Sequence, residues 1–82
     1  MKSQNSELTI ETLAIRLELL GIPPHCYSLC GFKDDALCLE TTEDGWIVYV
    51  AERGRKNYVE RFDSETAACT FILDELRVCI LY

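Results

Sequence analysis

The sequence predicts an α+β fold with an N-terminal helix, a four-stranded antiparallel sheet and a C-terminal helix, in the order α-β-β-β-β-α. Three observations lead to this prediction. Near both ends of the chain, apolar residues recur at intervals of three and four, as in amphipathic helices. Between them lie short runs rich in aromatic and β-branched residues, separated by isolated glycines. The 82 residues allow one domain, residues 1–82, with both helices expected on one face of the sheet.

The first helix is expected over residues 7–20. Its apolar stripe contains Leu8, Ile10, Leu13, Leu17 and Leu20. Ser6 is the expected N-cap, and Gly21 stands where many helices end in a glycine. Two consecutive prolines then favour an extended exit from the helix.

Four strands are expected over residues 26–29, 36–40, 46–52 and 58–62. Asp44-Gly45 is the strongest hairpin signal, because both residue types tolerate the positive φ angles of a tight turn. A second turn is expected around Gly54. The final helix should be capped by Asp63 or Ser64 and should run to about residue 78, with residues 79–82 forming either a last helical turn or a short docked tail.

The charge balance limits the classes of partner. Fourteen Asp and Glu against eight Lys and Arg give a net charge of −6, which repels phosphate backbones and anionic lipids and attracts basic proteins. Residues 53–61 carry a local charge of +3, but the following helix starts with Asp63, Ser64 and Glu65, which disfavours nucleic-acid binding. No membrane association is expected. The polar N-terminus is unlike a secretory signal, so a cytoplasmic location is expected.

No catalytic, metal-binding or cofactor-binding group is expected. The five cysteines are odd in number and form no CxxC pair, so reduced and mostly buried thiols are favoured over disulfides. His25, Cys26, Cys30 and Cys38 could supply four zinc ligands, but their spacing matches no known finger or ribbon. In an extended segment, His25 and Cys26 point to opposite faces and cannot form a base–nucleophile pair. The sequence therefore favours a protein that is not an enzyme.

The most informative feature is a segment of one charge sign. Residues 34–52 contain six carboxylates and no Lys or Arg. In the strand over residues 46–52, Trp46 and Tyr49 point to opposite faces, and each face looks apolar enough to be packed. Both residues can be core only if a partner or a dimer mate covers the second face. That face is therefore expected to be a docking surface with aromatic anchors and an acidic rim.

Residues 44–54, which read DGWIVYVAERG, and residues 62–69, which read FDSETAAC, resemble the core of small immunity proteins of bacterial polymorphic toxin systems. With residues 27–29 and 38–40, the resemblance extends over roughly residues 20–76. It implies a stoichiometric inhibitor, or antitoxin, that binds a cognate toxin domain encoded by the adjacent gene and has no catalytic residues. The expected partner-binding residues are Glu43, Asp44, Trp46, Tyr49, Glu52 and Arg53. The alternatives are a homodimeric regulatory or scaffold domain and, less favoured, a small nucleic-acid-binding domain.

Overall fold

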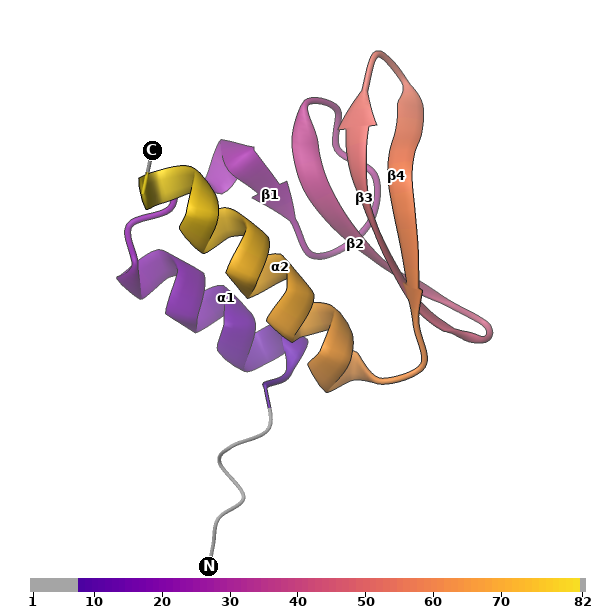
Figure 1. The fold of residues 1–82 in the computed structure, drawn as a ribbon, viewed down its shortest axis with the longest axis horizontal. Helices are drawn as coiled ribbons and strands as arrows, with labels where there is room; N and C mark the ends of the chain where they lie inside the picture. The colour runs from indigo at the N-terminus through magenta and orange to yellow at the C-terminus, as the bar shows by residue number, and fades with distance from the viewer. Residues whose placement is uncertain (1–7, 82) are drawn as a thin grey trace, which may run out of the picture.

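The α+β fold class is confirmed. The structure, a computed structural model, describes residues 8–81 and the side chains of residues 8–78. Its elements are α1 (Ile10–Leu19), the 3-10 helix η2 (Pro24–Cys26), β1 (Tyr27–Ser28), β2 (Ala36–Thr42), β3 (Gly45–Glu52), β4 (Arg55–Phe62) and α2 (Glu65–Leu81). The four strands form one sheet in chain order, and both helices lie on the same side of it (Figure 1).

Helix α1 begins later than the sequence predicts, because Thr9 caps it in a reciprocal arrangement with Thr12. The predicted cap Ser6 lies outside the described residues. The backbone N–H of Ile10 donates to the Glu65 carboxylate at 2.8 Å, which ties the start of α1 to the start of α2. The predicted glycine stop is confirmed. Gly21 has φ +79°, and the N–H of the next residue, Ile22, donates to the carbonyl of Leu17 in the last turn of the helix.

The prediction of a purely antiparallel sheet is wrong for the first strand. β1 has only two residues and pairs parallel to β2, with Tyr27 opposite Leu37. Parallel neighbours normally need a connection of a dozen or more residues, but a two-residue strand is short enough for residues 29–35 to return to its starting end. The N–H of Gly31 donates to the carbonyl of Leu39 and holds this crossing loop against the sheet. The other strand pairs are antiparallel, as expected.

The two hairpin turns differ from the prediction in their backbone geometry. Between β2 and β3 the two loop residues are Glu43 and Asp44, and neither has a positive φ; Gly45, with φ +144°, is already the first residue of β3. The turn with two left-handed residues is Arg53-Gly54, between β3 and β4. Strand β4 starts at residue 55 rather than 58, because this tight turn lets pairing begin directly after Gly54.

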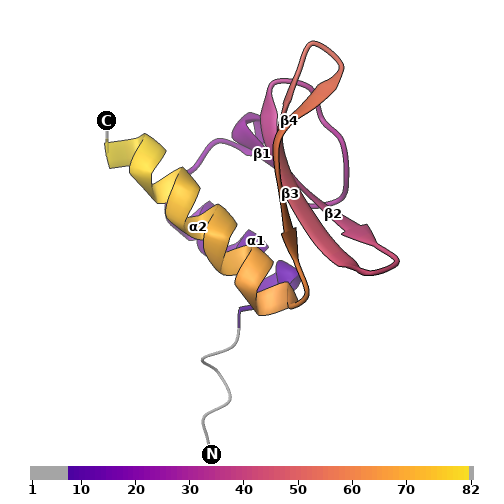
Figure 2. The same ribbon diagram turned by 45° about the vertical axis from the view of Figure 1, so that its right-hand side comes forward.

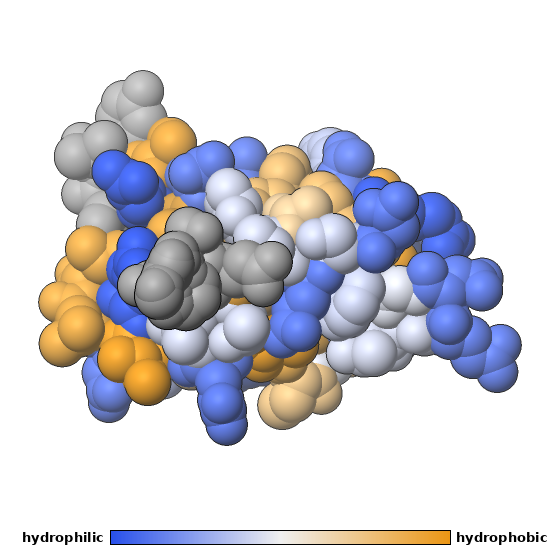
Figure 3. All heavy atoms as spheres, turned by 90° about the horizontal axis from the view of Figure 1, so that it is seen from below, coloured by the Kyte–Doolittle hydropathy of each residue, from blue (hydrophilic) through white to orange (hydrophobic). Residues whose placement is uncertain are grey.

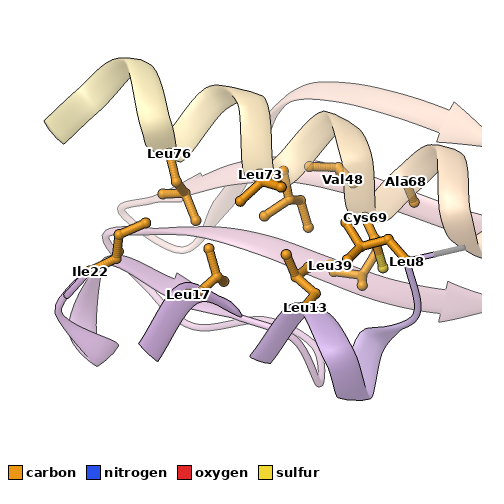
Figure 4. Close-up of a cluster of buried hydrophobic side chains, with 11 residues drawn as sticks. Leu8, Leu13, Leu17, Ile22, Leu39, Val48, Ala68, Cys69, Leu73 and Leu76 are labelled. Atoms are coloured by element: carbon orange, nitrogen blue, oxygen red, sulfur yellow. The ribbon is translucent and has the colours of Figure 1, made fainter. Parts of the chain in front are cut away.

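The main core lies between the sheet and the helices (Figure 4). Its buried residues are Leu8, Leu13, Leu17, Ile22, Leu39, Val48, Ala68, Cys69, Ile72, Leu73 and Leu76. Helix α2 packs directly on β2, β3 and β4, and α1 packs on α2. Ser64 caps α2 by accepting from the N–H of Ala67 at 3.1 Å, one of the two caps that the sequence predicts.

A second core cluster lies on the opposite face of the sheet and consists of Ala36, Cys38, Ile47, Tyr49 and Ala51. The loop over residues 29–35 passes across this face, on the side away from the helices (Figure 2). In that loop the Phe32 ring stacks on the Tyr49 ring, and both backbone polar groups of Lys33 bond to the Cys38 thiol. The expectation that only a partner or a dimer mate could cover this face is therefore wrong, because the chain covers it with its own loop.

Candidate partner-binding surfaces

The six residues predicted to bind a partner do not form one surface. Glu43 and Asp44 are exposed at the turn where β3 begins, whereas Glu52 and Arg53 are exposed at the turn where it ends. An eight-residue strand separates these turns by about 25 Å. The β2–β3 turn lies at the right in Figure 1, and the right-hand end of the molecule in Figure 3 is largely hydrophilic. The two turns are therefore separate candidate contact regions, of which only the first is acidic, since Glu52 stands beside Arg53 and Arg55 in the second.

The two predicted aromatic anchors are largely enclosed by the chain itself. Trp46 is half-buried and packs against the main core on the helix side of the sheet. Tyr49 is fully buried, with 0% of its surface exposed, in the second cluster. Sequence alternation correctly separates these two side chains onto opposite faces. The most exposed aromatic among the described side chains is instead Tyr58 on β4, at 82% exposure, and no sequence pattern singles it out.

Tyr49 anchors a small polar network on the outer face. Its hydroxyl donates to the Glu40 carboxylate at 2.7 Å, and the Lys56 ammonium lies 3.1 Å from the same oxygen. The ammonium also sits 5.0 Å from the centre of the Tyr49 ring, within cation–π range. Burial raises the pKa of the Tyr49 phenol, and the bond to Glu40 raises it further, so the hydroxyl remains a donor at neutral pH. These contacts give Tyr49 a structural role in the folded chain.

The same network makes folding stability depend on pH through Glu40. The hydrogen bond from Tyr49, followed by that from Lys56, lowers the pKa of Glu40 below its ordinary value of 4.5. Because the folded-state pKa is depressed, the stabilisation is present above pH 4.5 and is lost as the pH falls through the folded-state value. We expect the free energy of unfolding of the wild type to exceed that of Glu40→Gln at pH 6, and the difference to shrink towards pH 3. Urea denaturation at stepped pH measures this difference; a constant offset would contradict the assignment.

The described residues also form an apolar groove of about 580 Å³, which no sequence pattern predicts. It lies where η2, the C-terminal half of α2 and the adjacent ends of β2 and β3 meet. Figure 2 shows the reason for it: α2 contacts the sheet near its own N-terminus and then diverges from it. The apolar lining consists of Ile22, Pro23, Cys26, Ala36, Leu37, Val50, Ala51 and Leu76.

The rim of this groove is acidic. Its charged lining residues are Asp35 before β2, Glu52 at the end of β3 and Glu75 on α2, and none of the Lys, Arg and His side chains that the structure describes lines it. Asp35 and Glu52 belong to the acidic segment that the sequence singles out, whereas Glu75 is distant in sequence and comes from the other layer. Of the predicted site residues, only Glu52 lines the groove. Leu37 and Val50, which pair across β2 and β3, remain half-buried, although Leu37 also packs against the edge of the main core.

Of the four cysteines whose side chains the structure describes, Cys38 and Cys69 are buried, Cys26 is half-buried and Cys30 is exposed. Burial raises the pKa of the Cys69 thiol to about 11 and also raises that of Cys38, so both remain protonated near neutral pH. His25 is exposed in η2. Within the part of the chain that the structure describes, no three His, Cys, Asp or Glu side chains are grouped so that they could hold a metal ion. Neither described helix has the length and apolar content needed to cross a membrane.

Comparison with known proteins found no match: no family model, no curated protein and no solved structure is significantly similar to this chain.

Proposed function

We propose that this protein is an immunity protein, a stoichiometric antitoxin that binds and neutralises a basic bacterial toxin domain by direct contact. The observation that carries the proposal is an excess of uncompensated negative charge. Among the described side chains, one ion pair forms, between Lys56 and Glu40. The other five acids of the segment 34–52, namely Asp34, Asp35, Glu43, Asp44 and Glu52, are all exposed. A basic partner would neutralise these five carboxylates, which form no ion pair within the described part of the chain.

The charge pattern suits an inhibitor that must capture its target quickly. Complementary charges steer two proteins together and raise the association rate above the ordinary range of about 10⁵–10⁷ M⁻¹s⁻¹. A toxin made in the same cell is harmful while it is free, so rapid capture is useful. The resemblance of residues 44–54 and 62–69 to small immunity proteins points to the same class of partner.

The binding test is titration calorimetry against the C-terminal domain encoded by the gene immediately upstream, made catalytically inactive for expression. The proposal expects one-to-one binding with a nanomolar or lower Kd. Absence of heat together with absence of co-elution would overturn it.

The acidic turn between β2 and β3 gives a second prediction. Glu43→Lys with Asp44→Lys should slow association about tenfold at low salt and flatten its salt dependence, while the melting temperature barely changes, because both side chains are exposed at a turn. The control, Glu18→Lys with Glu60→Lys, changes the net charge equally at exposed positions on α1 and β4. Stopped-flow mixing measures both rates. Equal slowing in the two variants would show that the turn is not a contact.

A homodimeric regulatory domain is the second candidate, and one observation favours it. On α1, Leu19 is 83% exposed and Ile15 is 57% exposed, and they lie one helical turn apart. Such an apolar strip can mediate association between two copies. Sedimentation of the protein alone separates the candidates, since a dimer forms without any partner and Leu19→Glu would dissociate it.

A further inference from the structure

The groove combines two properties that select a particular kind of occupant. Its floor is apolar and only partly covered, since Cys26, Leu37 and Val50 each remain half-buried. Its rim presents Asp35, Glu52 and Glu75 to solvent. An occupant that fills it must cover apolar surface and also bring positive charge to the edges. Lysine and arginine side chains meet both needs, because a long apolar stem ends in a cationic group.

We infer that this groove binds a basic amphipathic segment of the partner protein, with Lys or Arg stems lying on Leu37 and Val50 and their charged ends reaching Asp35, Glu52 and Glu75. The inference deepens the proposed function, on which it rests for the partner's identity. It assigns a binding role to Glu75, Leu37 and Val50, and it adds a second contact, on the helix side of the sheet, to the one expected at the turn of Glu43 and Asp44.

Charge excludes the competing occupants. A second copy of this chain carries a net charge of −6 and would bring more negative charge to an acidic rim. A nucleic acid or an anionic lipid meets the same repulsion. A wholly apolar segment would cover the floor but would leave three carboxylates partly desolvated beside it, which costs free energy. A cationic segment compensates them.

The chemistry of the groove can be tested without the partner, using two probes that share an apolar tail and differ in charge. n-Octylammonium and octanoate are titrated into methyl-labelled protein, and the signals of Ile22, Leu37, Val50 and Leu76 are followed by NMR. We expect octylammonium to shift these methyl signals at lower concentration than octanoate does. Attraction of the single ammonium to the rim carboxylates, together with their repulsion of octanoate, corresponds to about a tenfold difference in Kd. The neutral variant Asp35→Asn, Glu52→Gln and Glu75→Gln should remove most of that difference while retaining the shape of the groove.

Two results would overturn the inference: methyl signals of the groove that do not move with octylammonium, or equal affinity for the two probes. A third contrary result would be shifts of the methyl signals of Ile15 and Leu19 on α1 in place of those in the groove. Binding would then follow exposed apolar surface and would not depend on the acidic rim.

Measuring how the wild type and two variants bind the inactive toxin domain shows whether the inference, the proposed function or both fail. Glu52→Lys with Glu75→Lys should weaken binding of the inactive toxin domain at least tenfold, whereas the control Glu18→Lys with Glu60→Lys, exposed acids outside the groove, should weaken it much less. Should the wild type bind and both variants bind equally, the groove is not the contact and the immunity function stands. Should the wild type fail to bind while octylammonium still selects the groove, the proposed function fails and the groove keeps its preference for cations.

Discussion

Replacing Gly45 by alanine should lower the free energy of unfolding by about 3 kcal/mol. Gly45 has φ +144°, a backbone conformation that costs an L-residue on the order of 1–3 kcal/mol. An added Cβ would also collide with the backbone carbonyl oxygen of Phe62 on β4, and such overpacking typically costs about 1–3 kcal/mol more. For a domain of this size, the sum corresponds to a fall of about 15 °C in melting temperature.

Gly31→Ala is the matched control for this prediction. Gly31 also has a positive φ, +116°, but no atom lies within 4 Å of the position that a Cβ would occupy. Its substitution should therefore show the backbone strain alone, and thermal unfolding followed by circular dichroism measures both variants. A Gly45→Ala variant no less stable than Gly31→Ala would contradict the collision with Phe62.

Truncating Tyr49 to alanine should cost about 4 kcal/mol, because removal of a large buried aromatic side chain costs roughly 3–5 kcal/mol. The ring fills the second core cluster beneath Phe32, and its hydroxyl holds Glu40. Tyr49→Phe should cost only about 1 kcal/mol, because it keeps the ring and because Glu40 still has Lys56 and water as partners.

This prediction separates a structural aromatic from a partner-binding one. Tyr58→Ala is the comparison, since that side chain is 82% exposed and its loss should change the melting temperature little. Urea denaturation gives the stabilities, and binding of the inactive toxin domain by Tyr49→Phe gives the second readout. If Tyr49→Ala left stability unchanged and abolished binding, Tyr49 would be the anchor that the sequence analysis expects.

Local chemistry made much of the fold predictable. The spacing of apolar residues predicts both helices, Gly21 marks the end of α1, and Ser64 caps α2, because these signals act within one turn of chain. Alternation also places Trp46 and Tyr49 on opposite faces correctly. The element order, the existence of four strands and their pairing from β2 onward follow from turn residues and β-branched runs.

Three features required the tertiary structure. The direction of β1 depends on where residues 29–35 pack, and a run of apolar residues carries no information about parallel or antiparallel pairing. The cover over Tyr49 depends on Phe32, which lies 17 positions earlier in the chain. The start of α1 depends in part on a contact with Glu65, 55 residues away.

Some properties of the candidate groove also follow from the sequence, whereas others depend on the tertiary structure. The sequence by itself determines the net charge of −6 and the run of acids in residues 34–52, because charge is a property of composition. Only the tertiary structure decides that Asp35 and Glu52 meet Glu75 around an apolar floor, because the groove exists where α2 diverges from the sheet. The angle between a helix and a sheet results from the packing of many side chains at once, and no local pattern in the sequence encodes it.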